Sequence, residues 1–137
     1  MPRSEAALCD AGPLVALFDA RDSAHETCQS ALKSWAGQLI TTWPVLTEAF
    51  HFLDRAGPGE FLWEFILNGA AQPVDLLPDD WQRMRALMRQ YSNMPMDLAD
   101  ASVVALAERL NVRQIFTLDR HFRLYRPRHY RGFDVFP

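Results

Sequence analysis

Short runs of apolar and β-branched residues recur along the chain, and such runs are typical of strands buried in a parallel sheet. Each run is bounded by residues that start or stop helices. We expect five strands, with the last one at an edge of the sheet. They span Ala6–Asp10, Leu39–Trp43, Pro73–Leu77, Gln114–Leu118 and Phe133–Phe136.

Between these runs, apolar residues recur every three or four positions, which is the period of an amphipathic helix. We expect Gly12-Pro13 to turn the chain into the first helix, Ser23 to cap the second and Pro44 to start the third. The expected helices span Leu14–Ala20, 24–35, 44–53, Glu60–Leu67, Trp81–Tyr91 and Met96–Leu110.

Two of these helices carry further information in their apolar positions. Glu60–Leu67 is apolar nearly all round, which in a chain this short favours partial exposure and a contact with a partner or a second copy. In Trp81–Tyr91, we expect Met84, Leu87 and Met88 to face the core.

The alternation of strands and helices predicts an α/β fold, a three-layer α/β/α arrangement around a mostly parallel sheet of four to five strands. In such sheets the functional crevice lies beyond the carboxyl ends of the strands. Acidic residues gather at that edge. Asp10 ends the first strand, Glu48 follows the second and Asp119 ends the fourth, while Asp97 and Asp100 open the helix before the fourth.

These carboxylates allow two interpretations. Asp97 is a good N-cap, and Asp100 lies where a carboxylate favours the helix dipole, so both can be purely structural. Carboxylates that converge in one crevice instead need compensation, because like charges repel strongly there. Oxygen ligands around Mg²⁺ or Mn²⁺ supply it. Whether Asp97 ligates a metal or caps its helix stays open at this stage.

Composition narrows the class of protein. The chain has 137 residues and 49% hydrophobic residues, and we expect residues 1–137 to form a single domain. No apolar run reaches the roughly 18 residues of a membrane span, and residues 1–5 lack the apolar core of a leader. Cys9 and Cys28 form no metal-ligand pattern. We therefore expect a cytoplasmic protein with reduced thiols.

Charge is distributed unevenly along the chain. The net charge is −3, yet residues 113–131 contain six arginines and one acid, Asp119. A basic segment on an acidic body favours a local anion-binding face, and the alternative is a solvated basic tail.

Four segments together resemble the PIN-domain family, and within it VapC-type toxins of bacterial toxin–antitoxin pairs. The resemblance spans nearly the whole chain and lies in the order and spacing of the segments. Asp10, Glu48, Asp100 and Asp119 match the four acidic positions of the family, and Asp97 matches an extra acid seen in some members. The segments are Leu8–Leu17, Thr42–Ala49, Asp97–Ala107 and Phe116–Phe122.

One departure follows the first acid, where this chain has Ala11-Gly12 and many members of the family carry Thr or Ser. The resemblance implies a metal-dependent ribonuclease. This chain lacks the hydroxyl that those members carry at that position.

The resemblance implies the chemistry and the partners of the site. It implies hydrolysis of RNA phosphodiester bonds with Mg²⁺ (or Mn²⁺), leaving a 5′-phosphate and a 3′-hydroxyl, together with a cognate antitoxin and a homodimer. The catalytic set would be Asp10, Glu48, Asp100 and Asp119. The metal ligands would be Asp10, Asp100, Asp119 and Asp97. Arg120, Arg123 and Arg126 follow the acid of the fourth strand, and we expect them to bind RNA phosphates.

Two other functions remain as alternatives. The first is a metal-free PIN-like module that only binds another protein. The second is a receiver-type phosphoacceptor switch, which needs a lysine near the last strand. The one lysine of the chain, Lys33, falls in a predicted helix, so this alternative is disfavoured.

Overall fold

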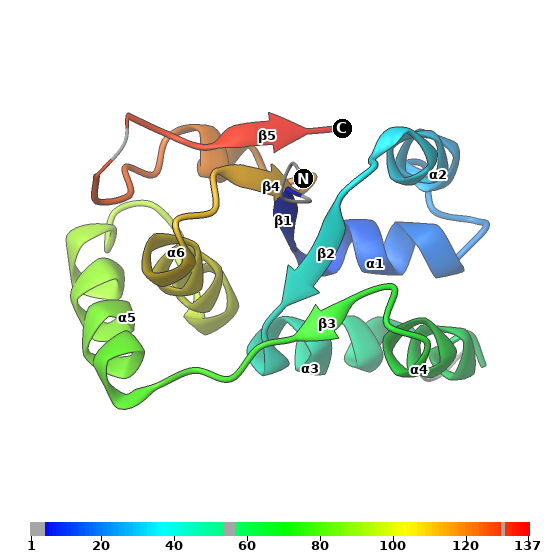
Figure 1. The fold of residues 1–137 in the computed structure, drawn as a ribbon, viewed down its shortest axis with the longest axis horizontal. Coiled ribbons are helices and arrows are strands. Elements are labelled where there is room, and N and C mark those ends of the chain that lie inside the picture. Colours follow the sequence, from blue (N-terminus) through cyan, green and yellow to red (C-terminus); the bar gives the residue numbers. More distant parts are fainter. Residues whose placement is uncertain (1–4, 54–56, 130) are drawn as a thin grey trace.

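A computed structural model describes residues 5–53, 57–129 and 131–137 (Figure 1). Over these residues the chain forms a five-stranded sheet of order β3-β2-β1-β4-β5, with every neighbouring pair parallel. The expectation about a leader falls largely on residues 1–4, which lie outside the described ranges. The strands are β1 (Ala6–Cys9), β2 (Gln38–Thr41), β3 (Gln72–Pro73), β4 (Gln114–Phe116) and β5 (Asp134–Phe136).

Helices cover both faces of the sheet, so the predicted three-layer α/β architecture is confirmed. Helices α5 and α6 lie on one side and α1 and α2 on the other (Figure 1). Helix α3 packs against both α1 and α6, and α4 packs against α1 and α3. The helices are α1 (Ala11–Phe18), α2 (His25–Ser34), α3 (Trp43–Leu53), α4 (Gly59–Leu67), α5 (Pro78–Gln90) and α6 (Leu98–Leu110), with a 3₁₀ turn, η2, at Arg120–Arg123.

The core is centred on β1 and on α6. Ala7, Leu8 and Cys9 of β1 are fully buried, as expected for a central strand that is covered on both faces. Residues 99–107 of α6 are all buried. Many of them are alanine or valine, and these small side chains let α6 pack closely against β1, α3 and α5.

Several element boundaries differ from the sequence prediction. Helix α1 begins at Ala11, directly after Asp10, and Gly12-Pro13 lies inside its first turn, where a proline lacks no needed donor. Ser23 is not the cap of α2; the helix begins at His25, and the Asp22 carboxylate accepts the N–H of Ala24 just before it.

Two further details of the prediction are corrected. Strand β3 is only two residues long, because it pairs with β2 alone at one edge of the sheet. Met88 is 36% exposed rather than buried, since the inward face of α5 is filled by Met84 and Leu87.

Helix α4 has the partly exposed apolar surface that the sequence predicts. Leu62 is buried and Ile66 nearly so, while Phe61, Trp63 and Leu67 are exposed. Cys9 and Cys28 are buried and free. In the part of the chain that the structure describes, no helix combines the length and apolar character that crossing a membrane requires.

Candidate active site

The site begins where β1 and β4 end. Cys9 of β1 pairs with Phe116 of β4, so the residues that follow these strands lie side by side. The backbone N–H of Asp10 donates to the carbonyl of Phe116 over 2.9 Å. The Thr117 hydroxyl donates to Oδ2 of Asp10 over 2.8 Å. The sheet register therefore delivers the first acid and a hydroxyl to one point.

Asp119 is fixed just beyond this pair. Its backbone N–H donates to the Thr117 hydroxyl oxygen over 3.0 Å. Its Oδ1 accepts the backbone N–H of His121 at 2.9 Å and lies 2.8 Å from Nδ1 of the same residue. The second carboxylate oxygen takes part in none of these contacts. This double contact holds Asp119 at the start of η2 and leaves Oδ2 for another partner.

The third part of the site is the start of α6. Oδ1 of Asp97 accepts the N–H of Asp100 at 2.9 Å, and Oδ2 of Asp100 accepts the N–H of Asp97 at 3.2 Å. These bonds form a capping box, so the predicted capping role of Asp97 is confirmed. Each carboxylate keeps one oxygen outside the box. The Tyr125 hydroxyl donates to the carbonyl of Pro95 over 3.2 Å and ties this start to the segment after η2.

Glu48 reaches the same region from α3. It lies in the second turn of the helix rather than the first. The hydroxyls of Thr42, which precedes α3, and Ser102 of α6 lie 2.7 Å apart, and Ser102 donates onward to the carbonyl of Ala99. This buried contact fixes the start of α3 against α6.

The pKa values show that the acids meet. Burial raises the pKa of Asp10, against hydrogen bonds from Thr117 and Ala11, and the charges of Asp119 and Asp97 raise it further. Burial likewise raises the pKa of Glu48, followed by the charges of Asp97, Asp10 and Asp119. Because each of these two carboxylates is affected by at least two other acids, the acids lie near one another.

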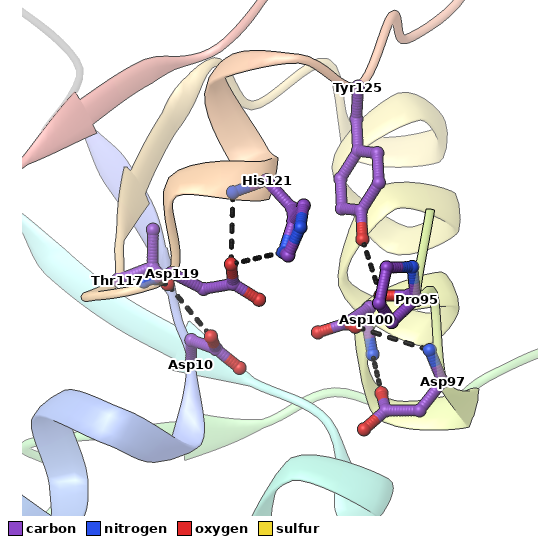
Figure 2. A network of polar contacts seen from close by, with 8 residues as sticks. All are labelled: Asp10, Pro95, Asp97, Asp100, Thr117, Asp119, His121 and Tyr125. Atoms are coloured by element: carbon purple, nitrogen blue, oxygen red, sulfur yellow. Dashed lines mark hydrogen bonds and ion pairs between the residues drawn. The ribbon is translucent and has the colours of Figure 1, made fainter. Parts of the chain in front are cut away.

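The pKa of Asp100 is also strongly raised. Burial raises its pKa from 3.8 to about 8, with the charges of Asp97, Asp10 and Asp119 adding to the shift. Figure 2 shows the carboxylates of Asp10, Asp119 and Asp100 facing a common space, with His121 beside it. The sequence prediction that distant acids converge at the carboxyl edge of the sheet therefore agrees with the geometry.

The chemistry of this donor set fits a hard divalent cation, because all of its groups are carboxylate oxygens whose mutual repulsion an ion would relieve. Among the residues described, no three His, Cys, Asp or Glu side chains are already arranged to hold a metal ion. A site built from a few carboxylates suits Mg²⁺ or Mn²⁺ with several retained waters.

The three arginines predicted to bind RNA differ in whether their guanidinium groups already make hydrogen bonds. Arg120 and Arg123 are exposed on η2, and within the described ranges neither guanidinium has a hydrogen-bond or ion-pair partner. Nη1 of Arg126 donates to the carbonyls of Arg123 and Tyr125 at 3.1 and 3.3 Å. Arg126 therefore has a structural role in closing this turn as well.

Sequence reasoning missed two residues that organise the site. Thr117 lies two positions before Asp119, and alternate residues of an extended segment share a side, so the spacing Thr-x-Asp was a usable signal. His121 lies two positions after Asp119, the spacing at which an aspartate side chain accepts a backbone N–H in a turn. Thr117 thus brings a hydroxyl to Asp10 from the end of the neighbouring strand.

The fold and the site agree with a known family. The model of the PIN domain matches residues 7–126 of this chain. The chain therefore belongs to the PIN domain family, and the resemblance found in the sequence is confirmed.

Within that family the chain is similar to proteins of known type. The chain is 29% identical over 142 residues to Ribonuclease VapC26 of Mycobacterium tuberculosis, covering 95% of this chain and 99% of the relative. Its fold is similar to that of VapC20 of Mycobacterium tuberculosis, a toxin that cleaves the sarcin–ricin loop, with a TM-score of 0.77, 17% identity, and 83% and 90% of the two chains covered.

A second solved structure with this fold is a toxin–antitoxin complex from Klebsiella pneumoniae. The TM-score is 0.66 at 20% identity, and the match covers 82% of this chain and 86% of that one. At identities this low, the TM-scores of 0.77 and 0.66 show that the fold is shared.

Proposed function

We propose that this protein is a divalent-metal-dependent endoribonuclease that acts as the toxin of a toxin–antitoxin pair. The observation that carries the proposal is the convergence of Asp10, Glu48, Asp97, Asp100 and Asp119 at one edge of the sheet. Similarity over nearly the whole chain to a ribonuclease, and similarity of fold to a toxin that cleaves the sarcin–ricin loop, support it.

In this proposal Asp10, Asp100 and Asp119 hold a Mg²⁺ or Mn²⁺ ion, with Asp97 beside them. When bound, the ion polarises the scissile phosphate and lowers the pKa of the attacking water. Glu48 has no hydrogen-bond partner among the described residues, so its carboxylate can turn toward the water or complete the ligand set. Thr117 orients Asp10 and thereby sets the geometry of the first ligand.

The substrate is gripped by its phosphates in this proposal. Arg120 and Arg123 stand next to Asp119, the last acid of the site, and their guanidinium groups are unpaired among the residues described. Arg120 and Arg123 can therefore bind phosphates that flank the phosphate held at the metal site. Arg126 is exposed and also binds phosphate in this proposal, although its Nη1 already donates to the carbonyl of Arg123.

The test is cleavage of a random RNA pool by the purified protein. With Mg²⁺ or Mn²⁺ we expect cleavage that EDTA abolishes, and products with 5′-phosphate ends. Asp10→Asn and Asp100→Asn should each lose at least about 100-fold in rate, since removing one acid removes charge stabilisation of the transition state. Glu64→Gln, which changes an exposed acid on α4, is the matched control and should cleave like the wild type. Full activity in both site variants would overturn the proposal.

The antitoxin and a second copy of the chain are the proposed protein partners. Exposed apolar side chains support this, on α4 (Phe61, Trp63 and Leu67) and around a groove of about 700 Å³ beside α5 (Trp81, Met88 and Leu98). Light scattering measures the oligomeric state. We expect a dimer that Trp81→Glu or Trp63→Glu dissociates. A monomer in the wild type would contradict the dimer without touching the nuclease proposal.

A further inference from the structure

A hollow of about 560 Å³ lies immediately beside the acidic site. Leu118, Asp119, Arg120, His121, Arg123 and Leu124 line it. Its volume lies within the usual range of roughly 300–1,000 Å³ for small-ligand pockets. Asp119 belongs to both this hollow and the acidic site, so the two adjoin.

The walls of the hollow are apolar although its rim is charged. Leu118 is 41% exposed and Leu124 is 54% exposed. These exposed leucines form an apolar surface beside two arginines. A flat, partly apolar group would shield that surface from water. The imidazole of His121 adds a ring to the same hollow.

The turn that carries the hollow is anchored in the core. Phe122 and Tyr125 of this segment are fully buried, and their rings pack edge to face with centroids 5.2 Å apart. The carbonyl of His121 accepts the N–H groups of Leu124 and Tyr125 at 2.8 and 3.0 Å. These buried rings and hydrogen bonds fix the turn that carries the hollow, and a pre-organised site binds at a lower entropic cost.

The charges identify the class of ligand. Arg120 and Arg123 sit at the rim without a carboxylate partner within the described ranges. A ligand that places an anion at two arginines and a flat heterocycle against apolar walls is a nucleotide. Proteins that bind unpaired nucleic acid combine these two features.

We propose that this hollow binds the base of an unpaired nucleotide next to the cleaved phosphodiester, with Arg120 and Arg123 on its phosphates. This inference rests on the proposed function and adds a source of sequence preference to it. Leu118 and Leu124 form the walls against the base, and His121 offers Nε2 at its edge, since Nδ1 already faces Asp119. The hollow therefore reads the base while the acids act on its phosphate.

The first test uses nucleoside 5′-monophosphates and the protein carrying Asp10→Asn, with methyl-labelled leucines observed by NMR in EDTA. AMP, CMP, GMP and UMP are compared with ribose 5-phosphate, which keeps the phosphate and lacks the base. At least one nucleotide should shift the methyl signals of Leu118 and Leu124 and bind at least about threefold more tightly than ribose 5-phosphate, because base contacts add to phosphate contacts. Equal binding of ribose 5-phosphate, or unmoved leucine signals, would overturn the inference.

Variants give the matched comparison. Leu124→Ala should weaken nucleotide binding about threefold or more without changing ribose 5-phosphate binding, and Leu124→Phe should strengthen it, since an aromatic ring stacks better on a base. Leu67→Ala removes a leucine of α4 that is 78% exposed, against 54% for Leu124, and should change neither affinity. Equal effects of Leu124→Ala and Leu67→Ala would contradict a base site.

Cleavage mapping separates this inference from the proposed function. In a random RNA pool, Leu124→Ala should flatten the base preference of the wild type beside the cut while Mg²⁺-dependent cleavage persists. An unchanged preference would overturn the base site and leave the nuclease intact. Absence of any cleavage by the wild type would overturn the proposed function, and with it the placement of the base beside a scissile phosphate, even where the NMR experiment detects nucleotide binding.

Discussion

The Thr117 hydroxyl donates a 2.8 Å hydrogen bond to Oδ2 of Asp10, and so joins the ends of β4 and β1. Because the bond favours the charged carboxylate, it opposes the rise in the pKa of Asp10 that burial causes. Thr117 thus keeps the first acid of the site both oriented and ready to ionise.

Replacing this hydroxyl tests its role. Thr117→Ala should raise the Mn²⁺ concentration needed for half-maximal RNA cleavage by about 10-fold, the lower range for loss of a group that orients a metal ligand. Thr117→Ser keeps the hydroxyl and should restore the wild-type value. Cleavage assays at a series of Mn²⁺ concentrations measure both. If the two variants behave alike, the hydrogen bond has no part in the site.

Asp100 makes the folded protein less stable when it is charged. Its pKa is raised from 3.8 to about 8, so its stabilising contribution is fully present below about pH 3.8 and is lost as pH rises through about 8. In EDTA at pH 9, Asp100→Asn should therefore raise Tm by about 3 °C or more. The amide keeps an oxygen that can accept the N–H of Asp97 in the capping box. Differential scanning calorimetry of the two proteins measures the difference.

Divalent cations should reverse this order. Mg²⁺ or Mn²⁺ should raise the Tm of the wild type, because a ligand that binds only the folded state stabilises it, and should leave Asp100→Asn nearly unchanged. A wild type more stable than Asp100→Asn in EDTA at pH 9 would contradict the electrostatic description of the site.

A second acid has the opposite pH behaviour. Burial alone would raise the pKa of Glu108, but hydrogen bonds from the Arg83 side chain at 2.7 and 2.9 Å and from the N–H of Arg128 at 2.8 Å outweigh it and lower the pKa. A lowered pKa stabilises the fold above the unfolded value near 4.5, and this contribution is lost as pH falls through the folded value.

Glu108→Gln should therefore cost about 2–3 kcal/mol of unfolding free energy at pH 7, since bonds to a charged group are among the stronger ones. The difference from the wild type should shrink below pH 4. Urea denaturation at pH 7 and pH 3.5 measures both values, with Glu64→Gln as the exposed control. A difference that is the same at both pH values would show that the charge of Glu108 is unimportant.

The arginines of η2 should set the salt dependence of RNA binding. In the Asp10→Asn background, Arg120→Gln with Arg123→Gln should weaken binding and reduce the slope of log K against log salt by about 1.4, from about 0.7 for each phosphate of a single strand. Arg21→Gln with Lys33→Gln removes two exposed charges elsewhere and is the matched control. Filter binding between 50 and 300 mM KCl gives the slopes, and an unchanged slope in the η2 variant would exclude these arginines from the interface.

The sequence predicted those site residues whose positions follow from where the strands end. Asp10 and Asp119 follow apolar runs, and parallel strands bring their carboxyl ends to one edge, so the convergence of these acids followed from topology. The predicted N-cap at Asp97 and the first-turn position of Asp100 are confirmed, and the structure adds that the two form a capping box.

What the sequence did not predict depends on contacts between distant segments. The bond from Thr117 to Asp10 requires the register of β1 against β4, which no single segment encodes. The shortness of β3 and the exposure of Met88 likewise depend on which neighbours remain once the sheet and α6 have packed. Local propensity alone does not determine those neighbours.

The central claim is that the converging acids bind a divalent ion. Calorimetric titration of Mn²⁺ into the wild type and into the Asp10→Asn, Asp100→Asn double variant tests it directly. The account predicts saturable uptake by the wild type and none by the double variant. No uptake by the wild type, or equal uptake by both proteins, would contradict it.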